Sequence, residues 1–506
     1  MSRAFFLDMQ NPTASELSRV PLIPIETFRR SIIHDVENGA EIASFFALPR
    51  AGGRKGGFLL VALLADHETG TLRCATAAVA DAWPSLTAEG CTAAHWFERE
   101  MAEQWRIRPE GHPWLKPLRF QPPMEGALPG EPTPEIGDAG FFRVEGDEVH
   151  EVAVGPVHAG VIEPGHFRFQ CHGETVLHME ISLGYQHRGI ERALAGGPDL
   201  RSVHYAETLA GDTSIGHAIA YSEILESLSG VHVPARAHAI RAIALELERI
   251  ANHIGDLGAL AGDVGFLPTS SWCGRIRGDV LTMTALICGS RFGRGLVRPG
   301  GVARDLDDGM IAELRSRLSL IARDAQGACA LLWTTPSVLA RFEGTGVLTR
   351  AAAFGIGLTG PAARACDIDR DVRRDHPSGI WRFSQVPVST GRTGDVFARA
   401  FVRWLEVQRS IAFIEEQLSS LPGGDVMIRV GALRRNALAV SLVEGWRGAI
   451  CHVAISDSRG AFLRYKVVDP SFRNWFGLAL AMRGQQVSDF PLCNKSFNLS
   501  YCGTDL

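Results

Sequence analysis

Residues 236–261, RAHAIRAIALELERIANHIGDLGALA, are the stretch that decides the fold. Apolar side chains recur in it at spacings of three and four, which places them on one face of a long helix. They are Ile240, Ile243, Ala244, Leu247, Ile250, Ile254 and Leu257. Helical patterns also occupy residues 199–228, 307–332 and 393–418. Together these segments predict a large bundle of helices.

Strand patterns surround the helical ones. Short apolar runs at 42–48, 57–65 and 71–79 are separated by turn residues and followed by a helical pattern at 92–105. They predict a small α+β domain over residues 1–120. Residues 121–150 are rich in Pro and Gly and lack apolar periodicity, which is typical of a linker.

The third part of the chain, residues 151–506, holds the predicted helices. Strand-like patterns also occur in it at 151–168 and at 439–468. The chain is therefore predicted to be α+β, with a small N-terminal α+β domain followed by a large, mainly α-helical domain that has peripheral β-strands.

Composition excludes several classes of function. The 506 residues are 46% hydrophobic and carry a net charge of −5, with both signs interspersed, which argues against a nucleic-acid binder. The sequence contains no run near the roughly 18–20 apolar residues that span a bilayer, and no signal-peptide pattern, so cytoplasmic residence is expected. The ten cysteines include no C-x-x-C pair and are expected to be reduced.

Residues 155–192, GPVHAGVIEPGHFRFQCHGETVLHMEISLGYQHRGIER, resemble the opening of the family of complex I D subunits and group 4 nickel–iron hydrogenase large subunits. The likeness continues through RPGG (298–301), VEGWRGAI (443–450) and DPSFRNW (469–475). Residues 94–120 are similar to the end of the complex I C subunit. The resemblance thus covers nearly the whole chain, in the fused C-plus-D order of formate-hydrogenlyase-type large subunits.

The resemblance identifies four positions where this family's hydrogenases hold nickel and iron through cysteine thiolates. The C-G-x-C-x-x-x-H pattern aligns with AGDTSIGH, which puts Ala210 and Thr213 at the first two positions. The C-x-x-C-T-D pattern aligns with SYCGTDL, which puts Ser500 and Gly503 at the other two. The chain is therefore expected to hold no metal and no cofactor of its own.

Complex I lacks the same cysteines and binds a quinone headgroup there, beside a loop His and a helix Tyr. His158 matches one loop histidine of that family, whereas a second corresponds to Ile162 and the helix tyrosine to Gly211. Asp212, His217 and Tyr221 are further polar residues expected in the same region. Quinone binding therefore stays open.

Three further residues occupy family positions with expected roles. Glu163 resembles the proton-transfer glutamate of membrane-bound hydrogenases, the alternative being an exposed loop carboxylate. Arg188 and Arg364 match positions near the cavity or the partner subunit, with ordinary salt bridges as the alternative. Catalysis or proton relay is thus assigned to His158, Glu163, Asp212 and His217, and cofactor contact to Arg188, Tyr221 and Arg364.

The resemblance also implies partners and a location. A small iron–sulfur subunit, similar to the complex I B subunit or to a hydrogenase small subunit, is expected to bring a 4Fe-4S cluster to this chain. Antiporter-like membrane subunits would hold the complex on the inner face of the bacterial cytoplasmic membrane. Any link to NADH would run through other subunits, because this chain shows no G-x-G-x-x-G turn between a strand and a helix.

Three functions remain at this point. The first is a metal-free large subunit in an NADH:quinone oxidoreductase-like or hydrogenase-4-like complex, supporting electron transfer from the partner's cluster to an acceptor, with quinone as one candidate. The second is a non-catalytic scaffold between soluble and membrane modules. The third, a working nickel–iron hydrogenase, lacks the thiolates it would need.

Overall fold

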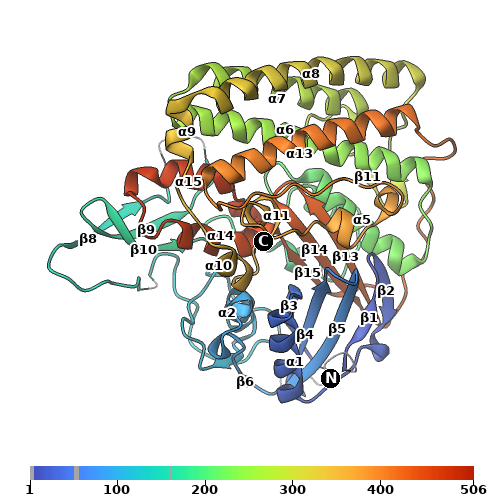
Figure 1. Cartoon of the computed structure of the whole chain (residues 1–506). Coiled ribbons are helices and arrows are strands. Elements are labelled where there is room, and N and C mark those ends of the chain that lie inside the picture. The colour runs from blue at the N-terminus through green and yellow to red at the C-terminus, as the bar shows by residue number, and fades with distance from the viewer. Residues whose placement is uncertain (1–4, 51–55, 139, 159–161) are drawn as a thin grey trace.

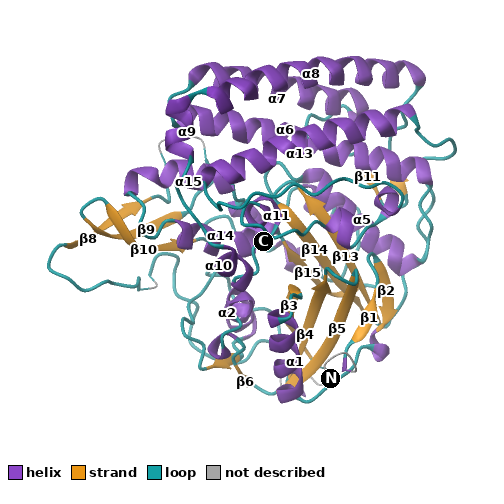
Figure 2. Cartoon of the chain, viewed as in Figure 1, coloured by secondary structure: helices purple, strands orange, loops and turns teal. Residues whose placement is uncertain are grey.

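The computed structural model describes residues 5–50, 56–138, 140–158 and 162–506. Figures 1 and 2 show long helices gathered in one part of the molecule and two four-stranded sheets in another. This mixture of helices and separate sheets confirms the predicted α+β class.

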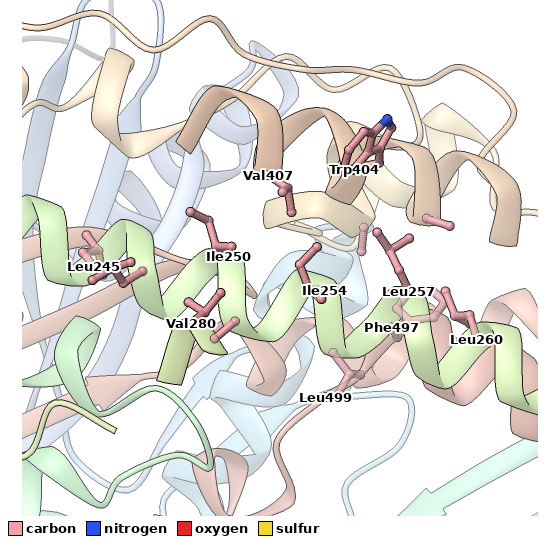
Figure 3. Packing of buried hydrophobic residues seen from close by; sticks show 14 of the residues in the cluster. Leu245, Ile250, Ile254, Leu257, Leu260, Val280, Trp404, Val407, Phe497 and Leu499 are labelled. Atoms are coloured by element: carbon pink, nitrogen blue, oxygen red, sulfur yellow. The ribbon is translucent and has the colours of Figure 1, made fainter. Parts of the chain in front are cut away.

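Four long helices form the bundle. They are α6 (Ala235–Asp263), α7 (Leu267–Cys288), α8 (Asp308–Thr334) and α13 (Val396–Ser419). Three of them confirm the predicted helices at 236–261, 307–332 and 393–418. In Figure 3, Ile250, Ile254 and Leu257 of α6 lie in the core next to α13, which contributes Val407. Helix α7 is not among the predicted helices, although its buried residues Cys273, Ile276, Val280, Met283 and Ile287 recur at spacings of three and four.

The helix predicted at 199–228 is wrong as a single element. The structure has α4 (Ser202–Glu207) and α5 (Ser214–Ser229), separated by a short loop. Asp212 in this loop has a φ of 58°, in the left-handed region, which a continuous right-handed helix cannot accommodate. The break matters because two of the four family ligand positions, Ala210 and Thr213, lie in it.

The N-terminal sheet has the order β1-β5-β4-β3. Its strands are β1 (Leu7–Met9), β3 (Glu41–Pro49), β4 (Phe58–Asp66) and β5 (Thr71–Val79), accompanied by α1 (Ile25–Glu37) and α2 (His95–Trp105). The three apolar runs predicted as strands, and the helix predicted at 92–105, are confirmed in this part of the chain.

The second four-stranded sheet has the order β15-β14-β13-β2. Its members are β2 (Thr13–Glu16), β13 (Ala437–Gly445), β14 (Gly448–Ser456) and β15 (Phe462–Val468). Every residue of β13 and β14 is buried, so these strands are central and not peripheral as expected. One face packs with the N-terminal apolar cluster and the other is covered by α5.

The strand predicted at 151–168 is also wrong as one element. The structure has β8 (Val149–Val154) and β9 (His166–His172), and β10 (Thr175–Ser182) completes a sheet of order β10-β9-β8. Pro156 and Pro164 lie between β8 and β9, where a residue without a backbone N–H cannot continue a ladder. The loop between these strands carries His158 and Glu163.

The remaining elements are short. They are α3 (Ile190–Leu194), α9 (Pro336–Phe342), α10 (Arg350–Gly355), α11 (Gly360–Arg364), α12 (Val372–Asp375), α14 (Pro470–Ala481), α15 (Phe490–Phe497), α16 (Tyr501–Thr504), β6 (Ala82–Pro84), β7 (Arg108–Glu110), β11 (Val297–Arg298) and β12 (Gly301–Val302). The described residues of 121–148, in the predicted linker, form neither helix nor strand. The domain boundaries themselves stay a prediction. Within the described ranges, no helix has the length and apolarity to cross a bilayer.

Candidate functional site

The four family ligand positions converge in space, and we call Ala210, Thr213, Ser500 and Gly503 the four-position junction. A Cβ placed on Gly503 would lie 3.0 Å from the Cβ of Ala210 and 2.9 Å from the Cγ of Asp469. The Ser500 Oγ accepts a hydrogen bond of 2.9 Å from the Gly503 N–H, which caps the N-terminus of α16. The backbone segments that carry these positions therefore lie close together, as the family pattern implies. They are in direct contact with each other.

The residues at this junction do not fit a nickel–iron centre. None of the four carries a thiolate, the ligand that these metals prefer. The contact between positions 210 and 503 also leaves no space for two metal ions between them. Within the residues that the structure describes, no group of three or more His, Cys, Asp or Glu side chains is arranged to hold a metal ion.

Cys502 does not replace the missing thiolates. Its Sγ lies 3.4 Å from the Ser500 Oγ. Burial, together with the charge of Glu163, raises the pKa of the thiol to about 11, so it is protonated at neutral pH. A single cysteine also cannot supply the four thiolate ligands of a nickel–iron centre of this family.

Arg447 connects the two halves of the junction. Its Nη1 donates to the Gly211 carbonyl at 2.7 Å and to the Thr213 Oγ1 at 3.0 Å, and its Nε donates to the Asn498 carbonyl at 2.6 Å. The guanidinium also lies over the Trp446 ring, 3.9 Å from its centroid. This buried cation fixes the loop before α5 to the segment before α16.

The loop between β8 and β9 reaches the junction through Glu163. Its carboxylate accepts hydrogen bonds from the backbone N–H groups of Tyr501 at 3.1 Å and Cys502 at 3.3 Å, at the N-terminus of α16. The Nε2 of His158 lies 3.0 Å from the Gly165 carbonyl, a contact within the same loop. Glu163 therefore lies beside the junction, whereas the ring of His158 is held by its own loop.

His217 lies in a hydrogen-bonded row of fully buried side chains that we call the buried polar chain: Asp469, His217, His452 and Tyr465. The Oδ2 of Asp469 is 3.0 Å from His217 Nε2, and His217 Nδ1 is 3.0 Å from His452 Nε2. His452 Nδ1 is in turn 2.8 Å from the Tyr465 hydroxyl. All four side chains have 0% exposure, and Asp469 touches the junction.

The charge state of the chain follows from its surroundings. Burial alone would raise the pKa of Asp469, but His217 and Arg447 outweigh it and hold the pKa below its usual range. Burial holds the pKa of His452 well below its usual value, and burial keeps that of Tyr465 well above. With Asp469 ionised and His452 neutral, the hydrogen bonds can be assigned so that each N–H or O–H of the chain points toward the carboxylate.

The other predicted residues are divided between this region and the surrounding structure. Asp212 lies next to the junction in sequence, but its side chain is 40% exposed and its Oδ2 lies 3.5 Å from Arg277 Nη2. Tyr221 is buried on α5, and its ring packs 6.1 Å from that of Tyr465, measured between centroids. The structure thus brings His217 and Tyr221 together, while Asp212 faces another direction.

The two predicted arginines have different surroundings. Arg188 donates to the carbonyls of Thr208 at 2.8 Å and Leu209 at 2.9 Å, which supports the loop that leads to the junction. Arg364 is fully buried and pairs with Glu406 and Glu444 at 2.9 and 2.8 Å. Arg364 therefore belongs to an ion-pair network between the bundle and the central sheet.

Sequence reasoning missed His452, Tyr465, Asp469 and Arg447 as members of the site. Arg447 and Asp469 lie in the matched motifs VEGWRGAI and DPSFRNW, which could have drawn attention to them. His452 and Tyr465 carry no such signal. They join His217 only because two strands near the C-terminus pack against α5.

Residues 263–437 match the family of the respiratory-chain NADH dehydrogenase 49 Kd subunit. The chain is also similar to hydrogenase-4 component G of Escherichia coli K12, with 30% identity over 437 residues that cover 84% of this chain and 76% of the relative.

Two shorter relatives are covered almost entirely. The carbon monoxide-induced hydrogenase of Rhodospirillum rubrum is 31% identical over 69% of this chain and 97% of its own length. The D 2 subunit of the NADH-quinone oxidoreductase of Herpetosiphon aurantiacus is 31% identical over 69% of this chain and 96% of its own length. The likeness therefore extends to hydrogenases and quinone reductases alike.

Proposed function

Because this chain belongs to the family of group 4 hydrogenase large subunits and complex I D subunits, we propose that it is a metal-free large subunit of a membrane-associated redox complex. In that role it supports electron transfer from an iron–sulfur cluster of a partner subunit to an acceptor other than nickel-bound protons. The observation that carries this proposal is the junction, where the family's ligand segments meet without thiolates and in direct contact.

The buried polar chain favours a redox role over an inert one. Burying a carboxylate and two imidazoles costs free energy, and apolar residues of similar size are often at least as stable in such places. A subunit that only filled space would gain nothing from an ionised Asp469 beside the junction. A reaction that consumes protons as well as electrons, such as quinone reduction, would use such groups.

The proposed complex needs other subunits. Its cluster would be held by a small iron–sulfur subunit and its membrane attachment by antiporter-like subunits, which fits a peripheral position on the inner face of the cytoplasmic membrane. Any oxidoreductase activity therefore belongs to the complex and not to this chain alone.

The test is metal analysis and a hydrogen-uptake assay of the complex purified through a tag on this chain. We expect the iron content of the complex to equal that of the partner's clusters. We expect no stoichiometric nickel and no hydrogen uptake. Stoichiometric nickel together with hydrogen uptake would refute the proposal, because it would require a metal site that these residues do not provide.

The second candidate is a non-catalytic scaffold that couples soluble and membrane modules. The contact between positions 210 and 503 favours it, since a substrate would have to displace these residues to enter. If the chain is such a scaffold, His158→Gln, Glu163→Gln and Asp212→Asn should leave turnover of the complex unchanged. A loss of turnover in Glu163→Gln, with the complex still assembled, would contradict the scaffold.

A further inference from the structure

Strand β8 forms one edge of the β10-β9-β8 sheet, which lies at the left periphery of the molecule in Figure 1. It pairs with β9 in an unbroken register from Val149 to Val154, and none of its residues is buried. The Val149 N–H donates to the Gly146 carbonyl at 3.2 Å, and no other backbone group of β8 bonds to a described residue outside the sheet. Alternate N–H and C=O groups of β8 are therefore available to a further strand.

The opposite edge of the same sheet is covered. The Gly484 N–H donates to the Val176 carbonyl of β10 at 2.8 Å, and the Val176 N–H donates to the Gln485 carbonyl at 2.9 Å. A bulge also interrupts β10 between Val176 and His178. Proteins commonly protect sheet edges with such coverings, with bulges, or with proline and lysine. Strand β8 has an even register and neither proline nor lysine, so it has the regular form that accepts an additional strand.

The two faces of β8 differ, and they define the side chains that an added strand would need. Val152 and Val154 pack against the large apolar cluster, each opposite a fully buried phenylalanine of β9. Glu151 lies on the other face, where its carboxylate accepts a hydrogen bond of 2.9 Å from Arg168. An added strand would therefore carry apolar side chains at every second position, next to the two valines.

The segment that leads into β8 is acidic. Glu145, Asp147 and Glu148 precede the strand, and all three are exposed. The Glu148 carboxylate lies 3.0 Å from the His172 ring, whereas no described residue forms an ion pair with Glu145 or Asp147. A lysine or arginine on the added strand would be attracted to this end of β8, and an acidic side chain would be repelled.

We propose that β8 binds an extended, basic segment of another subunit, which adds a fourth strand to this three-stranded sheet. The segment has apolar residues at alternate positions and lysine or arginine beside residues 145–148. Backbone hydrogen bonds to β8 supply the affinity of such a contact, and the alternating side chains fix its register. The inference goes beyond the proposed redox role and does not depend on it, because the same contact would serve a scaffold.

Hydrogen exchange of the intact complex, resolved at single amides by mass spectrometry, tests the pairing. In an unpaired edge strand, every second N–H group points away from the sheet and exchanges nearly as fast as in an unfolded chain. An added strand protects both alternating sets of amides. We expect all amides of residues 150–154 to exchange at least about tenfold more slowly than in an unfolded chain. Fast exchange at every second residue would refute the proposal.

A photo-reactive residue in β8 identifies the occupant. Ala153 is exposed, so its replacement by p-benzoylphenylalanine places the reactive group beside the added strand. Illumination of the purified complex should cross-link β8 to a peptide of another subunit that contains lysine or arginine and alternating apolar residues. A cross-link to a second copy of this chain, or to a peptide without this pattern, would overturn the proposal.

The double variant Glu145→Lys and Asp147→Lys tests the charge of the occupant. It should release the cross-linking subunit from the tagged chain at a lower salt concentration than the wild type does, because two attractive charges become repulsive. The matched control is Glu343→Lys with Glu416→Lys, which makes the same change of charge at two exposed positions of other elements. Release of the subunit at the same salt concentration from both double variants would refute a basic occupant. A melting temperature of each variant confirms that its fold is intact.

Discussion

At the scale of single residues, the four-position junction is a packed contact between two backbone segments. Ala210 and Gly503 are small, so the backbone segments that carry them can touch. Arg447 then donates to the part-buried carbonyls of Gly211 and Asn498, and without it the Gly211 carbonyl would keep only the Thr213 hydroxyl as a donor. The stability of this region should therefore depend on the guanidinium as much as on apolar contacts.

Arg447→Ala should lower the free energy of unfolding by about 2–4 kcal/mol. The substitution removes the hydrogen bonds from Arg447 to the part-buried carbonyls of Gly211 and Asn498, and it removes the cation from the Trp446 ring. Urea unfolding of the purified chain measures the change. Arg323→Ala, on the exposed side of α8, is the control and should change the value by less than about 0.5 kcal/mol.

Restoring all four cysteines should not restore a metal site. A side chain at position 503 would contact Asp469 and Ala210 at 3.0 Å or less, so Gly503→Cys is expected to destabilise the chain. Ser500→Cys alone should be tolerated, since its neighbours already accommodate a side chain. Metal analysis of the quadruple variant, purified with its partners, checks this, and bound nickel would contradict the packing argument.

Glu223 predicts a measurable pH dependence. It is buried among Ser441, Ser378, Glu226 and Arg241, and burial raises its pKa from 4.5 to about 7. The unfolded chain releases this proton near pH 4.5 and the folded chain near pH 7, so this group lowers the stability as the pH rises through that window. Above pH 7 its contribution is constant.

The test for Glu223 is Glu223→Gln, which keeps the neutral shape. The unfolding free energy of the variant, relative to the wild type, should increase between pH 4.5 and 7 by up to about 3 kcal/mol. Chemical unfolding at several pH values measures the difference. A difference that does not vary with pH would show that Glu223 is not protonated in the folded chain.

At the scale of elements, the central sheet joins the two ends of the chain. Strand β2 pairs with β13, and Asn11 just before β2 bonds to both the N–H and the carbonyl of Leu442 at 2.8 Å. Its Nδ2 also donates to the His376 carbonyl at 2.7 Å. The residues predicted as a separate N-terminal domain therefore supply a strand to the sheet of the large domain.

Asn11→Ala should destabilise the protein by about 3 kcal/mol, because it leaves three buried backbone groups without partners. Thermal and urea unfolding measure this effect. Asn38→Ala, at the exposed end of α1, is a suitable control. An effect of Asn11→Ala no larger than that of the control would mean that solvent replaces the lost bonds.

The elements also show where sequence patterns are informative. Helix α6 is predictable within a few residues because it has one regular apolar period, and strands β3 to β5 are predictable because each is a short, largely apolar run bounded by turn residues. The patterns fail at Asp212 and between β8 and β9, where a left-handed residue or prolines interrupt a continuing apolar pattern. The central position of β13 and β14 could not be predicted, because the burial of their second face depends on the apolar cluster formed by the N-terminal part of the chain.

Only those residues of the site that lie in recognisable sequence motifs can be predicted from the sequence. Spacing identifies positions 210, 213, 500 and 503 and the histidine at 217. It cannot identify His452 and Tyr465, because their relation to His217 exists only after a strand packs on a helix. Cysteine loss predicts a missing metal, but not that an arginine and a small-residue contact would occupy the region.

At the scale of the whole molecule, the loop between β8 and β9 presents apolar side chains next to the junction. Val157 is 89% exposed and Ile162 is 50% exposed, although both are aliphatic. Exposed apolar residues beside a functional region commonly mark a protein contact. This loop is where we expect the iron–sulfur partner to bind.

Val157→Asp and Ile162→Asp should reduce co-purification of the iron–sulfur subunit with the tagged chain. A carboxylate placed in an apolar contact would lose hydration without gaining a partner. Leu331→Asp, on α8 and 41% exposed, is the control for adding a charge to an exposed leucine. Equal recovery of the partner with all three variants would place the contact elsewhere.

The pairing of β2 with β13 has a consequence for how a cell makes this protein. A ribosome synthesises residues 13–16 long before residues 437–445. The nascent chain therefore contains β2 without its partner strand β13 for most of its synthesis. Until β13 emerges from the ribosome, the apolar surface that it will cover is exposed to solvent and prone to aggregation. Such a polypeptide is expected to depend on chaperones, and to lose yield sharply when translation stops early.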